Sequence, residues 1–462
     1  AGSPPVNGSE AESRVAPREN HLLDRRRAGV LCAVSSLPVG THEAFLDFLA
    51  AAGIAVWQVL PLNPPDPHGS PYSSASLFAI DPALGQLVDR PGAPAVGLDS
   101  AGGADYARFI VARARFGAPW TAWPEGLRAG EPGALADFEA TTGDARERIV
   151  AAQRQASAAW ATLKRAANAR GILIMGDMPL YPAHDSADVW AHPELFDLDI
   201  AGEPNEVAGV PPDYFSATGQ LWGNPLYDWG THRAQGFAWW RRRVDHQLAW
   251  FDLLRIDHFR GLEAYWAVPR GGRADAGRWR PAPGRALLGA LEPGQLRRLV
   301  AEDLGFVTPA VEALRDEYSL PGMRVLQFAF DGRSDNPHLP DRCPAHAVMY
   351  TGTHDNDTSL GWYRALDGAT RHRVERLIGG TGRRWPWPLI EAALQSPART
   401  AVVPLQDLLG LDGRHRLNTP GTATGNWGWQ ADPASLTPTL ARRIRRRLAA
   451  SDRLQDDAGK WR

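Results

Sequence analysis

The sequence predicts an α/β fold, specifically a (β/α)8 TIM barrel with mostly helical insertions between barrel strands. The first observation is that short apolar runs recur along the chain with helical stretches between most of them. The second is that several of these runs end in polar or acidic residues, as barrel strands do at their carboxyl ends. The eight runs cover residues 29–35, 54–60, 171–179, 251–257, 299–305, 323–330, 347–350 and 400–403.

The first two runs show the repeating unit most clearly. The apolar run 29–35 is followed by residues 43–52, where Phe45, Phe48 and Leu49 have helical spacing. Gly53 is a typical residue for the end of that helix. The next run, residues 54–60, stops at a proline. Strand, helix and strand in this order predict a parallel pair with a helical crossover.

The chain outside the predicted strands divides into a lead-in, an insertion, a long loop and a tail. Residues 1–28 are predicted to be a disordered lead-in, and residues 29–451 a single catalytic barrel domain. Residues from about 83 to 168 are mostly helical in pattern and are predicted to be an insertion subdomain. Residues from about 180 to 229 are rich in polar and aromatic side chains with little periodicity, which predicts a long loop that covers a binding groove. Residues 452–462 are expected to be a flexible tail.

Composition excludes several classes of protein. A net charge of −2 gives no general attraction to nucleic acid or to an anionic membrane. The basic run 442–447 has the spacing of a surface helix with a solvated face. Two cysteines, Cys32 and Cys343, make no disulfide framework. No apolar stretch is long enough to span a membrane, and the N-terminus lacks the apolar core of a signal peptide. A cytoplasmic enzyme, a monomer or simple homo-oligomer, is therefore expected.

Three carboxylates stand at the ends of predicted strands: Asp257, Glu302 and Asp355. In a barrel these ends converge on one face. Carboxylates held close together raise one another's pKa, so that one stays protonated while another is ionised. Glycosidic bond cleavage needs this separation of an acid from a nucleophile. Arg255 lies on the same strand face as Asp257 and is expected to keep that carboxylate ionised.

Other interpretations of these residues remain open at this point. Any one of the three carboxylates could be a helix cap or an ion-pair partner. The run from His354 to Asp357 could also be a metal site, although it lacks a second histidine at ligand spacing. The 18 tryptophans suit a ligand with flat apolar faces, such as a sugar, although most of them are expected to lie in the core.

A set of longer motifs resembles one family, the 4-α-glucanotransferases of glycoside hydrolase family 77. The matching segments occur in a consistent order between about residues 29 and 430. They are WQVLPL (57–62), SPYSS (70–74), GDMP (176–179), DSADVW (185–190), GVPPDYFSATGQLWGNP (209–225), LRIDHFRG (254–261), AEDLG (301–305), GTHDNDT (352–358), NTPG (418–421) and GNW (425–427).

The resemblance implies a retaining transferase that moves segments between maltodextrins, with glucose as an acceptor. It implies Asp257 as nucleophile, Glu302 as general acid and base, and Asp355 as the third carboxylate. It further implies substrate contacts from the side chains around them: Arg255, His354, Tyr72, Trp222, Asp213, Tyr214 and Asp185. It implies no metal and no organic cofactor.

One departure from the family pattern follows Pro38. The family has a Gly- and Tyr-containing loop there, whereas this chain has only the four residues 39–42 before the first helix. Substrate contacts made by that loop are expected to be absent. Two alternative functions are an α-amylase-like hydrolase that uses water as acceptor, and a glucan-binding protein with weakened catalysis.

Overall fold

A computed structural model describes residues 21–88, 91–96, 100–212, 218–379, 384–422 and 424–454. Eight parallel strands form one sheet in the order β10-β11-β12-β1-β2-β3-β6-β9. Their bounds are β1 (Arg27–Leu31), β2 (Val56–Gln58), β3 (Leu173–Met178), β6 (Leu253–Ile256), β9 (Leu299–Ala301), β10 (Gly322–Val325), β11 (Ala347–Tyr350) and β12 (Thr400–Pro404).

The sheet closes on itself between its two end strands. The backbone amide of Ala301 in β9 donates to the carbonyl of Pro321, which immediately precedes β10, at 2.9 Å. All eight predicted strands are present in the expected order, and the (β/α)8 barrel is confirmed. The strand predicted at residues 323–330 is shorter than expected, because β10 ends at Val325 and is followed by a short 3-10 helix at Leu326–Phe328.

The strands alternate between the barrel interior and the surrounding helices. In β6, Leu253 belongs to the interior cluster, whereas Leu254 and Ile256 pack in the outer cluster with helical residues. Arg255 therefore points inward, and Asp257 follows on the same side. The interior is filled below the site by inward side chains such as Met175, Val300 and Tyr350.

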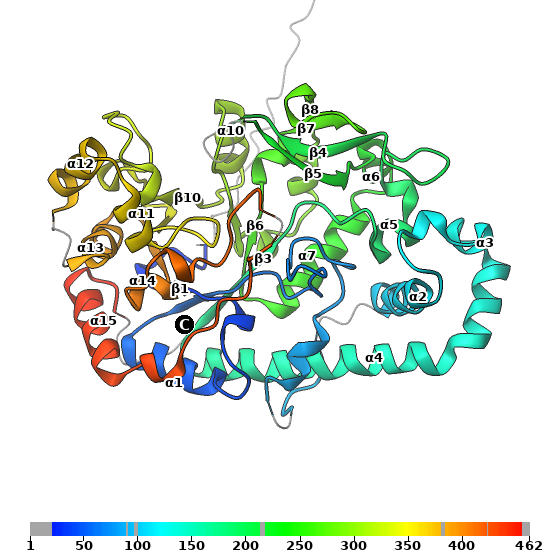
Figure 1. The fold of residues 1–462 in the computed structure, drawn as a ribbon, viewed down its shortest axis with the longest axis horizontal. Helices are drawn as coiled ribbons and strands as arrows, with labels where there is room; N and C mark the ends of the chain where they lie inside the picture. Colours follow the sequence, from blue (N-terminus) through cyan, green and yellow to red (C-terminus); the bar gives the residue numbers. More distant parts are fainter. Residues whose placement is uncertain are drawn as a thin grey trace, which may run out of the picture.

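Helices surround the barrel, as Figure 1 shows. They include α1 (His42–Ala52), α7 (Ala238–Trp250), α8 (Gly284–Gly289), α9 (Pro293–Leu296), α10 (Pro309–Glu317), α11 (Ser359–Ala365), α12 (Gly368–Ile378), α13 (Trp387–Gln395), α14 (Leu405–Leu408) and α15 (Pro438–Ala450). The segment between β2 and β3 holds α2 (Ser100–Phe116), α3 (Glu125–Arg128) and the long α4 (Pro132–Ala169). Among the described residues, no helix has both the length and the apolarity to cross a membrane.

The segment 180–229 is not an irregular loop, and this expectation was wrong. It contains α5 (Ala187–Ala191), β4 (Glu206–Val210), β5 (Gln220–Pro225) and the start of α6 (Trp229–Ala234). Strands β4 and β5 join β7 (Ala264–Pro269) and β8 (Arg278–Pro281) in an antiparallel sheet of order β5-β4-β7-β8. β4 and β5 each contain a glycine, and β5 exposes Leu221 and Trp222, so the alternation by which a strand is recognised is broken.

The ends of the described chain pack against the barrel where flexibility was expected. Residues 1–20 and 455–462 lie outside the described residues. Leu23 is buried in the barrel interior, so the predicted disorder does not extend to residue 28. Arg453 is fully buried, so the predicted flexible tail does not begin at residue 452.

One glycine in β3 is required by packing. A Cβ at Gly176 would lie 2.1 Å from the ring of Phe251, which immediately precedes the turn into β6. The close approach of this ring to β3 depends on the missing side chain. Gly176 therefore keeps Asp177 on β3 in register with Arg255 on β6, the residue with which it pairs along the two strands.

Arg453 provides a test of how the chain end is held. Its guanidinium donates to the carbonyls of residues 27, 394, 396, 398 and 399. Replacing it by methionine removes all of these donors, although the carbonyls of residues 394, 396 and 399 keep a second donor from Arg26 or from the amide of Arg27. We expect Arg453→Met to lower the free energy of unfolding by at least about 3 kcal/mol in urea titrations. Arg446→Met, at an exposed position of α15, is the control and should have little effect.

Candidate active site

A cavity of about 760 Å³ opens at the carboxyl ends of the barrel strands. The cavity is lined by most of the residues that the sequence singled out: Tyr72, Asp185, Trp222, Arg255, Asp257, Glu302, His354 and Asp355. These residues come from segments up to 283 positions apart along the chain. The barrel therefore brings the three predicted carboxylates into one site, as strand ends on a common face should.

An ionic chain joins two buried side chains, Asp177 and Arg255, to the half-buried Asp257, which lines this cavity. Both oxygens of Asp177 accept from Nη1 of Arg255, at 2.6 and 2.7 Å. Nη2 of Arg255 lies 2.9 Å from Oδ1 of Asp257. Burial opposes the charge on Arg255, but Asp177 and Asp257 together hold its pKa well above the usual value. Arg255 is therefore a fixed cation between two carboxylates.

Asp257 and Glu302 lie in environments that favour their protonated forms to different degrees. Burial raises the pKa of Asp257 to about 6, although the nearby Arg255 acts in the opposite direction. Burial also raises the pKa of Glu302 to about 8, and the charge of Asp257 adds to this effect. Arg255 thus contacts Asp257 as expected, but it does not outweigh burial. Near neutral pH the pair shares one proton, held mainly by Glu302.

Glu302 is oriented by the main chain. Its Oε2 accepts from the backbone amide of His258 at 2.7 Å, and its Oε1 accepts from the backbone amide of Leu304 at 3.0 Å. His258 has a left-handed backbone with φ of 50°, uncommon for a residue other than glycine. The tight turn after β6 thereby directs its amide toward the end of β9.

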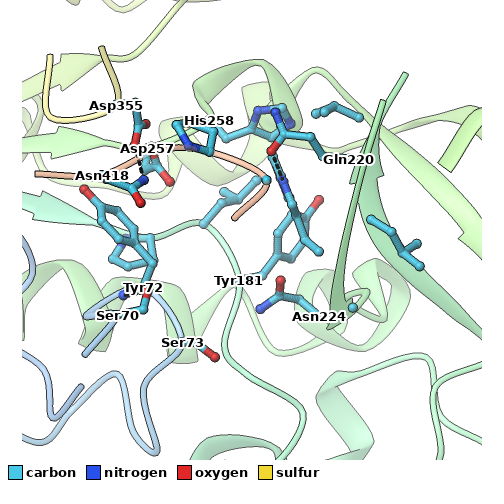
Figure 2. Close-up of a pocket in the computed structure, with 18 of the residues that line it drawn as sticks. Ser70, Tyr72, Ser73, Tyr181, Gln220, Asn224, Asp257, His258, Asp355 and Asn418 are labelled. Atoms are coloured by element: carbon cyan, nitrogen blue, oxygen red, sulfur yellow. Dashed lines mark hydrogen bonds between the residues drawn. The ribbon is translucent and has the colours of Figure 1, made fainter. Parts of the chain in front are cut away.

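A polar cluster faces Asp257 from the other side. The hydroxyl of Tyr72 donates to Oδ2 of Asp177 at 2.7 Å and lies 2.9 Å from Nε2 of His354. That nitrogen is also 3.4 Å from Oδ2 of Asp355. The amide nitrogen of Asn418 donates to Oδ1 of Asp355 at 2.6 Å. Figure 2 shows Tyr72, Asn418, Asp257 and Asp355 grouped at one end of the cavity.

Aromatic rings form part of the cavity wall. The rings of Tyr72 and His354 are stacked, with centroids 5.3 Å apart, and Trp427 lies 5.8 Å from Tyr72. Trp222, on β5, meets the ring of His258 edge to face at 4.8 Å. These rings present apolar faces beside carboxylates. A pyranose ring matches both, because its C–H faces pack on aromatic rings and its hydroxyls donate to carboxylates.

The other predicted contact residues have different positions. Asp185 accepts from the backbone amide of Trp120 at 3.1 Å and pairs with Arg113 at 3.2 Å, so it ties the helical insertion to the cavity rim. Asp213 and Tyr214 lie outside the described residues. Figure 2 shows Tyr181, Gln220 and Asn224 together at the end of the cavity away from Asp355.

Among the residues that sequence reasoning did not assign to the site, four lie around the three carboxylates: Asp177, His258, Asn418 and Trp427. Asp177 gave the same signal as the chosen carboxylates, an acid at the end of a barrel strand, and could have been included. His258 directly follows Asp257. Asn418 and Trp427 come from an irregular segment after β12, where no periodicity indicates which side chains turn inward. The family motifs 418–421 and 425–427 contain them and were the signal that could have found them. Among the described residues, no group of three or more His, Cys, Asp or Glu side chains could hold a metal ion.

Comparison with known proteins identifies the family. The family model for 4-alpha-glucanotransferase, glycoside hydrolase family 77, matches residues 38–90 and 100–436. The chain belongs to this family. The 4-alpha-glucanotransferase of Thermus thermophilus is 42% identical over 497 aligned positions, covering 93% of this chain and 99% of that protein. The enzyme from Synechocystis sp. is also 42% identical, covering 91% and 96% of the two chains.

A solved structure agrees with the fold. The amylomaltase from Streptococcus agalactiae, solved in complex with acarbose, superposes with a TM-score of 0.85 at 29% identity, covering 93% of this chain and all of that one. The predicted family, barrel and enzyme class are confirmed: the chain is a 4-alpha-glucanotransferase acting on α-glucans. The alignment of 497 positions exceeds the 462 residues of this chain, so the Thermus relative has segments that this chain lacks.

The raised pKa of Glu302 predicts a stability change with pH. A carboxyl whose pKa is 4.5 when unfolded and about 8 when folded binds its proton more tightly in the folded state. Its contribution to stability therefore falls as the pH rises from 4.5 to 8. Glu302→Gln removes this titration, so we expect the variant to gain free energy of unfolding relative to wild type across this range. Urea unfolding at pH 5, 6.5 and 8 measures the difference; a constant difference would contradict the raised pKa.

Proposed function

We propose that this chain transfers α-1,4-glucan segments by a retaining double displacement, with Asp257 as nucleophile and Glu302 as acid and base. The observation that carries the proposal is the pair of half-buried carboxyls that line one cavity, with pKa values of about 6 and about 8. Between these values Asp257 is largely ionised and Glu302 is largely protonated. That is the starting state for attack on an anomeric carbon with protonation of the leaving oxygen.

The first half of the reaction uses both carboxyls together. An oxygen of Asp257 bonds to the anomeric carbon as the bond from that carbon to the glycosidic oxygen breaks. Glu302 gives its proton to that oxygen, and the shortened glucan leaves with a free 4-hydroxyl. Arg255, 2.9 Å from Asp257, holds the nucleophile in place. Asp355, fixed by Asn418, binds sugar hydroxyls and stabilises the positive charge that develops on the ring.

The second half reverses the roles. Glu302, now ionised, takes the proton from the 4-hydroxyl of an incoming maltodextrin or of glucose, and that oxygen displaces Asp257. Water is the competing acceptor, so the groove must be filled by sugar and protein. The antiparallel sheet contributes Trp222 to the cavity wall, and the segment 180–229 is the proposed cover of the groove.

Removing the nucleophile tests the assignment. We expect Asp257→Asn to lower kcat for maltotriose disproportionation by on the order of 10⁴-fold or more, because no covalent intermediate can form. Binding of acarbose, followed by calorimetry, should persist within about tenfold. Asp335→Asn, an exposed aspartate, is the control for the substitution itself. A variant at Asp257 that keeps a tenth of wild-type activity would overturn the assignment.

The pH profile tests the division of roles. The value of kcat/KM should rise through about pH 6 as Asp257 ionises and fall through about pH 8 as Glu302 loses its proton. With α-maltosyl fluoride as donor, the departing fluoride needs no proton, so the falling limb should disappear from kcat/KM. A falling limb of equal depth with both donors would show that the group titrating near pH 8 is not the acid.

A further inference from the structure

The cavity continues past Glu302 to an aromatic wall that the proposed chemistry does not use. Its lining includes Arg260, Trp279 and Phe306. Phe306 is four residues beyond Glu302 on the same loop, and its side chain is 60% exposed. Burial of a phenylalanine ring stabilises the folded state. An exposed ring that lines a ligand cavity therefore suits contact with a bound ligand.

The ring of Phe306 is held in a defined orientation. It lies nearly parallel to the indole of Trp279, with an interplanar angle of 20° and centroids 6.4 Å apart. Trp279 is packed in turn against Trp266 on the neighbouring strand β7, edge to face at 5.1 Å. The indole nitrogen of Trp266 donates to the carbonyl of Ala274 at 2.7 Å. The aromatic surface is therefore preorganised by the small antiparallel sheet.

Arg260 supports the two rings from the protein side. Its guanidinium carbon lies 3.6 Å from the centroid of Trp279 and 5.5 Å from that of Phe306, in cation–π contact. Its Nε and Nη1 are buried and make no hydrogen bond within the described part of the chain. The nearest carboxylate, Glu263, is 3.8 Å away. The guanidinium of Arg260 thus packs against the two rings, and its contact with Trp279 holds this aromatic surface in place.

The position of the aromatic surface formed by Phe306 and Trp279 indicates which part of the glucan it contacts. A general acid lies next to the glycosidic oxygen, between the sugar that stays on the enzyme and the sugar that leaves. The retained sugar is assigned to the side with Tyr72, His354 and Asp355. Phe306 lines the same cavity four residues beyond Glu302 and is exposed, so we assign it to the other side of Glu302, beside the leaving and accepting chain.

We infer that Phe306 and Trp279 form a stacking platform for an acceptor glucan, at a ring beyond the one that receives the new bond. This inference rests on the proposed role of Glu302. It makes Phe306 a determinant of acceptor length: glucose is too short to reach the platform, whereas a maltooligosaccharide can lay an apolar ring face on it. Donor cleavage itself does not require the contact when the leaving group is small.

The test uses α-maltosyl fluoride as donor, because fluoride departure places no sugar on the acceptor side. Transfer is measured with glucose and with maltotetraose as acceptors, each at varied concentration. We expect Phe306→Ala to raise the acceptor KM for maltotetraose about three- to tenfold, with the KM for glucose changed less than twofold. Phe306→Trp should restore the wild-type KM. Leu377→Ala, an exposed apolar residue on α12, is the matched control.

Two outcomes would overturn the inference. One is an unchanged KM for both acceptors in Phe306→Ala, which would leave the ring without a role in acceptor binding. The other is an equal rise for both, which would indicate a general disturbance of the loop that holds Glu302. Either result leaves the proposed function intact as long as Asp257→Asn is inactive. Activity in Asp257→Asn would instead refute the proposed mechanism.

Discussion

The site depends on the buried pairing of Arg255 with Asp177 and Asp257. An ionised group removed from water is costly unless it is paired and hydrogen-bonded, and here one guanidinium contacts two carboxylates from neighbouring strands. Asp177 also accepts from Tyr72, whose hydroxyl reaches His354. A single ionic centre therefore connects β3 and β6 with residues that follow β2 and β11. Disturbing it would move the nucleophile and its neighbours together.

The same centre explains how two carboxyls in one cavity take different states. Arg255 lowers the pKa of both carboxyls, but only Asp257 pairs with it directly and is raised only to a pKa of about 6, whereas Glu302 accepts from neutral amides and is raised to about 8. Proximity of carboxylates contributes to this difference, as the sequence reasoning supposed. Burial is the larger cause in both cases, and it became visible only once the cavity walls were in place.

The barrel was predictable because its signals are local. Each strand is a short apolar run, and the acids that follow Leu254–Ile256 and Leu299–Ala301 mark the catalytic face. The antiparallel sheet was missed because β4 and β5 contain glycine and because β5 and β8 leave most of their residues partly or fully exposed, so neither pair shows the buried apolar run that marks a barrel strand. Asn418 and Trp427 lie within the family motifs 418–421 and 425–427, but their contacts with Asp355 and Tyr72 are properties of the folded chain, and no periodicity after β12 indicates which side chains of these motifs turn inward.

The way Glu302 is held has a consequence for how such an enzyme diversifies. Its two oxygens are positioned by backbone amides at 258 and 304, which every residue type except proline can supply. The side chains at 304 and at Phe306 just beyond are therefore free to vary without misaligning the proton donor, whereas position 258 requires a residue that tolerates a left-handed backbone. Substitutions that change substrate preference can therefore occur near Glu302 without changing the position of its carboxyl group. A wide repertoire of acceptors is accessible in this fold by changes that leave the chemical step intact.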